Sequence, residues 1–176
     1  MVNPRAAAKA LRAWLAIPRQ IEKAVQGLPD AALNLRGGTE AWSIRETVHH
    51  LVEANLVASN IIIAALARSG CAYDWSWVTP DTSWMQRVGY TTAPIRPAVS
   101  LLRALGKHFS AVIGATAGGL DREVRLFDAP GSEPYTKKVE EILVQEVEHA
   151  AEHLRDVART RAGHRRGGRR KVHPSR

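Results

Sequence analysis

The sequence predicts an all-α protein folded as an up-down four-helix bundle. Four long segments carry apolar residues at the spacing of about 3.6 residues that is typical of amphipathic helices, and clusters of glycine and proline separate them. The last segment has its apolar residues alternately four and three positions apart, which is the pattern of a helix packed in a bundle. The residues of this seam are Leu143, Val147, Ala150, Leu154 and Val157.

The chain is long enough for one domain. At 176 residues it can bury about 70% of its unfolded surface, and its 45% hydrophobic residues supply a core. We expect a folded domain over residues 1–160 and a disordered basic tail over residues 161–176, because the Gly- and Arg-rich end has little to bury. Eight of the 25 basic residues and none of the 17 acidic residues lie in residues 157–176. The net charge of +8 therefore describes the tail.

The first helical segment is interrupted by Pro18. Proline is tolerated in the first turn of a helix but costs about 3 kcal/mol in its interior. We therefore expect the main helix to begin near Ile17, with residues 4–16 as a separate or kinked turn, and to end at Leu28-Pro29-Asp30.

The second helix has the clearest start in the chain. Ser43 followed by Glu46 is a capping box, in which each side chain accepts a hydrogen bond from the other residue's backbone N–H. The helix is expected to run from Ser43 to about Arg68. Helical phase places its polar side at Arg45, His49, Glu53 and Asn60.

A long tryptophan-rich connection, residues 70–94, joins the second and third helices, with a short helical turn expected near residues 82–88. The third helix is expected from Ile95 to about Ala117. Residues 123–127 alternate enough to be extended, and the last helix is expected to open near Tyr135.

Composition narrows the function classes. The chain contains no uninterrupted apolar run of about 18 residues and no signal-peptide pattern at its start, so we expect a cytoplasmic protein without a membrane span. Cys71 is the single cysteine, which excludes a disulfide framework and a thiolate metal cage. Any metal must therefore be held by histidine and carboxylate.

The histidines include a separated set with the spacing of a metal site. His149 and His153 lie four residues apart on the last helix and point the same way, so a third imidazole from a neighbouring helix would complete a three-nitrogen site with an open position. The second helix offers His49 and His50. Helical phase favours His50, which lies at the inner edge of that helix, as the inward imidazole.

These motifs resemble a known family. The patterns Trp42-Ser43-x-x-Glu46-x-x-x-His50-Leu51 and His149-x-x-x-His153-Leu154 are similar to those of the DinB-like superfamily of metal-dependent proteins, which includes the YfiT-like bacillithiol transferases. The lead-in over residues 28–33 also resembles the connection between helices in that family. The resemblance covers about residues 10–158.

The resemblance implies that His50, His149 and His153 hold a divalent metal, with zinc or nickel as the candidates. It implies an enzyme, a thiol S-transferase or a hydrolase, that acts on a small-molecule substrate, with a low-molecular-weight thiol as a candidate cosubstrate. No residue is assigned a catalytic role. The alternative is a non-catalytic, metal-stabilised homodimer whose basic tail contacts nucleic acid. Because the tail lacks interleaved aromatic residues, a solubilising role is favoured over nucleic-acid binding.

Two features around the expected metal remain open at the level of sequence. A ligating imidazole needs its second nitrogen anchored, and Glu46, Glu146 and Glu152 are candidates for that anchor. The tryptophans of the 70–94 connection either form an aromatic lid over the metal or serve as apolar anchors of the loop.

Overall fold

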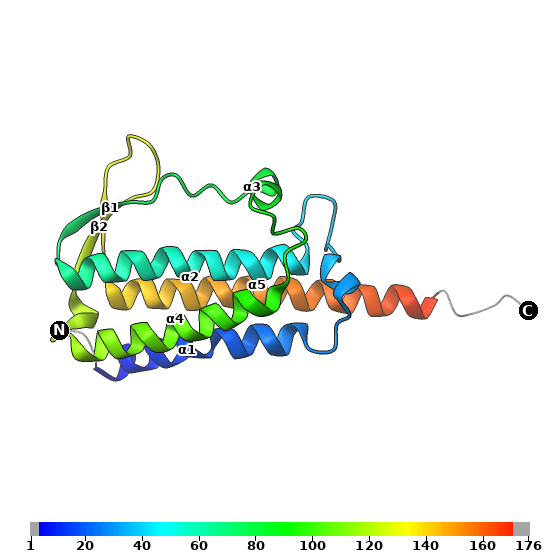
Figure 1. Cartoon of the computed structure of the whole chain (residues 1–176), viewed down its shortest axis with the longest axis horizontal. Coiled ribbons are helices and arrows are strands. Elements are labelled where there is room, and N and C mark those ends of the chain that lie inside the picture. The colour runs from blue at the N-terminus through cyan, green and yellow to red at the C-terminus, as the bar shows by residue number, and fades with distance from the viewer. Residues whose placement is uncertain (1–3, 171–176) are drawn as a thin grey trace, which may run out of the picture.

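Four long helices form a bundle (Figure 1). The structure is a computed structural model that describes residues 4–170, with side chains described for residues 8–164. The bundle helices are α1 (Pro4–Val25), α2 (Ile44–Ala67), α4 (Ile95–Ala115) and α5 (Val139–Arg170). Both α1 and α2 pack against α4 and α5, so the four helices form a square. The predicted four-helix bundle is confirmed.

The helices do not simply alternate in direction. α2 and α4 run the same way, because the connection between them carries the chain back along the bundle (Figure 1). At the shared C-terminal end of these two helices, β1 (Cys71–Asp74) follows α2 and pairs in parallel with β2 (Glu123–Phe127), which follows α4. This arrangement corrects the expected up-down order, since the long 70–94 connection can span the bundle whereas a short loop would force neighbouring helices to be antiparallel.

A small sheet covers one end of the bundle. β2 lies between β1 and β3 (Tyr135–Lys138), and β2 pairs with β3 in antiparallel register. Val124 and Leu126 point from β2 into the core. The predicted extended segment is confirmed, but the segment at Tyr135 is a strand and not the start of the last helix, because its backbone groups pair with β2 instead of with the next helical turn.

α1 is continuous through Pro18, which corrects the expected break. Trp14, Ile17 and Ile21 lie on one face of this helix and are almost completely buried. Burial of large side chains on both sides of the proline offsets the loss of one backbone hydrogen bond.

The start of α2 is as predicted. The Ser43 side chain accepts a hydrogen bond from the Glu46 backbone N–H, and the Glu46 carboxylate accepts one from the Ser43 backbone N–H. The predicted polar side of this helix is exposed only at Asn60, however, because Arg45 and His49 are buried and Glu53 is half-buried. Arg45 is 2% exposed and donates hydrogen bonds to the Ala93 and Asp30 carbonyls.

α2 is also long and apolar enough, by length and composition alone, to cross a membrane. Its place in the bundle accounts for this character, since more than half of the most apolar stretch is buried. Val48, Leu51 and Ile62 of this helix lie in the hydrophobic core.

α5 extends beyond the expected end of the domain. The helix continues to Arg170, ten residues past the expected boundary at residue 160. Arg161 donates hydrogen bonds to the Ala24 carbonyl in the last turn of α1 and to the Gln26 carbonyl just after it, which ties the first part of this extension to the bundle. The rest of the predicted tail, residues 171–176, lies outside the described residues.

Removing the α2 cap should destabilise the fold measurably. We expect Ser43→Ala to lower the free energy of unfolding by about 1 kcal/mol, because the buried Glu46 N–H loses its hydrogen-bond acceptor. Urea unfolding followed by circular dichroism measures this change. Ser100→Ala, at an exposed position within α4, is the matched control and should change stability little. Equal effects of the two substitutions would contradict a stabilising role for the cap.

Candidate metal centre

Three histidines from two helices converge at one point. His50 comes from the first half of α2, and His149 and His153 lie one turn apart on α5. One nitrogen from each ring lies within 4.8 Å of the other two. The structure therefore brings together the three residues that the sequence predicts as ligands.

The geometry of this cluster suits a divalent ion. The Nε2 atoms of His50 and His149 are 3.0 Å apart, and the three ring pairs meet edge-on with centroids 4.7 to 5.0 Å apart. Three nitrogens bound tetrahedrally to zinc at about 2.0–2.1 Å lie about 3.3 Å from one another. Because one separation of 3.0 Å is close to this value and the others do not exceed 4.8 Å, the residues fit a three-nitrogen site with small side-chain movements.

Burial keeps the imidazoles of His50 and His153 neutral, which is the form that binds a metal. Burial lowers the pKa of His50 to about 3, and repulsion by His149 and His153 adds to the effect. Burial and the neighbouring His149 also lower the pKa of His153. The Nδ1 atom of His50 is buried and has no hydrogen-bond partner among the described residues. A neutral imidazole is the ligating form, and an unpartnered buried nitrogen is typical of a functional or ion-binding position.

Glu146 is the carboxylate best placed to anchor a ligand. It lies one turn before His149, its Oε2 atom is 3.8 Å from His149 Nδ1, and that oxygen is buried without another hydrogen-bond partner in the described structure. A carboxylate on the second nitrogen orients a ligating imidazole and raises its basicity. Among the three carboxylates suggested by the sequence, Glu146 is therefore favoured.

The other two candidate anchors are in different surroundings. Glu46 caps α2 and forms an ion pair with Arg36 at 2.8 Å. Burial alone would raise the pKa of Glu46, but hydrogen bonds from Ser43 and Arg36 outweigh burial and lower it. Glu152 is exposed. Glu46 thus stabilises the start of the helix that carries His50 and does not anchor a ligand.

His49 lies outside the cluster, as helical phase predicts. Its Nε2 atom is 3.1 Å from the Ala93 carbonyl oxygen, and its ring stacks on Tyr90 with centroids 4.7 Å apart. Both partners belong to the connection that crosses α2. His49 therefore holds this connection against the helix, and it is buried rather than exposed.

Two cavities meet at the cluster. An apolar cavity of about 330 Å³ ends at His50 and His149, and a more polar cavity of about 690 Å³ reaches His153. The Trp42 side chain lines both cavities, stacks on His153 with centroids 5.7 Å apart and lies 4.6 Å from the His50 ring. The three histidines and Trp42 therefore form a partition that can be reached from two sides.

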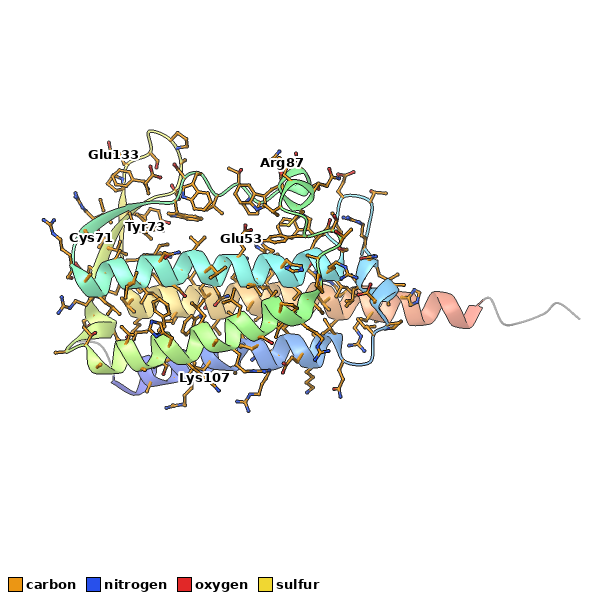
Figure 2. The ribbon with its side chains drawn as sticks, viewed as in Figure 1. Glu53, Cys71, Tyr73, Arg87, Lys107 and Glu133 are labelled. Atoms are coloured by element: carbon orange, nitrogen blue, oxygen red, sulfur yellow. The ribbon has the colours of Figure 1, made fainter. Side chains whose placement is uncertain are left out.

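Glu53 is a site residue that the sequence interpretation assigned only to the polar side of α2. It lines the apolar cavity together with His50 and His149. Figure 2 shows its side chain directed from α2 towards the overlying connection, where the carboxylate accepts hydrogen bonds from Trp84 Nε1 at 2.9 and 3.1 Å. Burial raises the pKa of Glu53 despite these hydrogen bonds. Its position one turn after His50 was the signal available in the sequence.

The tryptophans of the connection have separate roles. Trp75 lines the apolar cavity, and Trp84 donates hydrogen bonds to the Glu53 carboxylate. Trp77 is 61% exposed and contacts Trp84. The aromatic lid over the metal stays a prediction.

The fold and the three inward histidines place this protein in the class of helical bundles that have a candidate metal centre between two adjacent helices. Within this class, the sequence profile of the DinB superfamily matches residues 13–157. The chain belongs to the DinB superfamily, as its histidine motifs predict.

Individual relatives agree with this assignment. An inferred metal-dependent hydrolase from Geobacillus kaustophilus (strain HTA426) is 28% identical over 128 residues, which is 69% of each chain. A second inferred metal-dependent hydrolase, from Geobacillus thermodenitrificans (strain NG80-2), is 25% identical over 112 residues, or 60% of each chain.

A solved structure shows the same fold. YfiT from Bacillus subtilis, described as a probable metal-dependent hydrolase with an unusual four-helix bundle topology, superposes with a TM-score of 0.77 at 20% identity. The superposition covers 96% of this chain and 91% of that chain. Because it includes nearly the whole of both chains, the likeness extends to the overall fold.

Removing one ligand should abolish stoichiometric metal binding. We expect protein purified without chelator to contain about one zinc or nickel ion per chain, and His153→Ala to lose it on dialysis, because two imidazoles bind a divalent ion far more weakly than three. Elemental analysis measures the content. His108→Ala, at an exposed position on α4, is the matched control and should keep the metal. Unchanged metal in His153→Ala would exclude this residue as a ligand.

Removing the anchor should weaken metal binding without abolishing it. We expect Glu146→Gln to lower metal affinity about 10- to 100-fold, because His149 loses the carboxylate that orients it. Competition with a fluorescent chelator measures the affinity. Glu148→Gln, at an exposed position on the same helix, should leave it unchanged. Equal affinities of the two variants would show that Glu146 does not act on the site.

Proposed function

We propose that this protein is a divalent-metal-dependent hydrolase whose metal, zinc or nickel, is held by His50, His149 and His153. The observation that carries the proposal is the convergence of three imidazole nitrogens, with His50 and His149 in the lining of an apolar cavity. Membership of the DinB superfamily and the names of the relatives support the same reaction class.

Three protein ligands leave a coordination position open to a water molecule or to a substrate oxygen. When bound there, a divalent ion lowers the pKa of water and polarises a carbonyl or phosphoryl group. The protein's own contribution is to fix the three ring orientations: Glu146 acts on His149, and Trp42 packs against His50 and His153.

Glu53 is the residue best suited to accept a proton from the attacking water. It lines the same cavity as His50, and burial raises its pKa, which makes the carboxylate a stronger base than an exposed glutamate. The Trp84 indole holds the carboxylate in place by donating to both oxygens. A fixed carboxylate of raised pKa beside the candidate metal suits general-base catalysis.

Thiol S-transfer is the second candidate, and the polar cavity favours it. This cavity reaches His153 from the side of Trp42 opposite the apolar cavity, and Arg36, Arg159 and Asp156 contribute charged groups to its wall. A hydrophilic thiol could approach the open metal position from this side while an apolar electrophile approaches from the other. The low-molecular-weight thiol is therefore retained as a candidate cosubstrate.

Hydrolysis should depend on both the metal and Glu53. With metal-loaded protein and a panel of nitrophenyl acyl and phosphate esters, we expect turnover that chelation abolishes and zinc or nickel restores. Glu53→Gln should lower kcat at least about 100-fold with full metal content, because it removes the proton acceptor. Glu133→Gln, an exposed glutamate in the loop before β3, is the matched control.

The outcomes separate the two candidate reactions. Turnover that survives chelation would contradict the proposal, and so would metal-loaded protein that is inactive on the whole panel. Conjugation of monobromobimane to a low-molecular-weight thiol, without ester hydrolysis, would favour S-transfer instead.

A further inference from the structure

The apolar cavity is a channel that starts at the candidate metal and follows α2. Along this helix its lining includes His50, Ala54, Ala58 and Ile61, which share one helical face. Ile61 lies eleven positions after His50, or about 17 Å at the helical rise of about 1.5 Å per residue. The cavity is therefore elongated, and its reactive end lies at the histidines.

The wall away from the histidines is built from apolar side chains of separate elements. α5 contributes Ile142, the sheet contributes Leu126 and Tyr135, and the connection contributes Trp75 and Val78. The small side chains of Ala54 and Ala58 leave space on the α2 side. Such a wall binds an apolar chain through burial of surface and does not require particular polar groups on it.

The charged residues that line the channel limit further which ligands it can bind. Glu53 and Glu146 are acidic groups near the histidine end, and no lysine or arginine contributes to the lining among the residues that the structure describes. A permanently anionic group within the channel would meet like charge without a partner. The channel therefore suits an uncharged chain.

We propose that this channel binds an extended, uncharged acyl or alkyl chain of the substrate and places the group to which the chain is attached at His50 and His149. The inference rests on the proposed function for the reaction at that end, but the binding of the chain depends on the apolar wall alone. Val57 lies midway along the α2 side and is only partly buried, so a larger side chain at this position projects into the channel.

The test uses straight-chain alkyl hydroxamates, from acetohydroxamate to octanohydroxamate, on the metal-loaded full-length protein. The hydroxamate group binds the metal, and the dependence of affinity on chain length measures how well the alkyl chain fits the channel. We expect Kd to fall about fourfold for each added methylene, which is the value of one buried methylene. Isothermal titration calorimetry measures each Kd, and a Kd that does not change with chain length overturns the proposal.

Two variants locate the chain. Val57→Phe, which narrows the channel, should reduce the preference for octanohydroxamate over acetohydroxamate at least tenfold while metal content and acetohydroxamate affinity stay unchanged. Ile63→Phe adds the same bulk at an exposed position of α2 and should behave as the unmodified protein. An unchanged preference in folded, metal-loaded Val57→Phe overturns the proposal.

A parallel series separates this inference from the proposed function. Primary alcohols from ethanol to octanol are titrated into chelator-treated protein and followed by tryptophan fluorescence, since Trp75 and Trp42 line the channel. Affinity that rises with chain length, and falls in Val57→Phe, supports the channel even if the protein proves to bind no metal. Metal-dependent hydrolysis without any chain-length dependence in either series would keep the function and overturn the channel.

Discussion

The antiparallel packing of α2 against α5 is the constraint on which the rest of the site depends. On one side of their contact lie core residues such as Leu51, Leu143 and Ala150, which are fully buried. On the other side the same contact brings His50 against His149 and His153. Because the helices are fixed by close packing, the three imidazoles stay together although each would be better solvated apart. Burial then keeps His50 and His153 neutral and able to bind a metal.

The parallel direction of α2 and α4 has a direct consequence for the site. The chain must return along the bundle between these helices, and the returning segment covers a face of α2 that would otherwise be exposed (Figure 1). The Ala93 carbonyl of this segment is a hydrogen-bond partner of both Arg45 and His49. Trp84 of the same segment donates a hydrogen bond to Glu53. The cover thus pairs these polar groups, and its residues Trp75 and Val78 form part of the wall of the apolar cavity.

Local sequence patterns correctly predict those features that depend only on residues close together in the chain. The Ser43 and Glu46 cap, the phase that chooses His50 over His49, and the seam on the last helix are all set by residues within one or two turns. Pro18 shows the opposite case. Its intrinsic cost predicts a break, but burial of Trp14 and Ile21 on either side keeps α1 continuous. Tyr135 lies in a strand because it pairs with Leu126, nine residues earlier and beyond the reach of a helical-periodicity pattern.

By itself the sequence determined the four amphipathic helices, the family and the three histidines, because helical periodicity and short motifs encode them directly. Tertiary structure decided how those parts enclose a site: the parallel return of α4, the choice of Glu146 over Glu46 as anchor, the place of Glu53, and the channel along α2. The direction of α4, the place of Glu53 and the channel depend on contacts between residues far apart in the chain, and Glu146 becomes an anchor only because α5 packs against His50. Such contacts are set by the packing of whole faces, which no local pattern specifies.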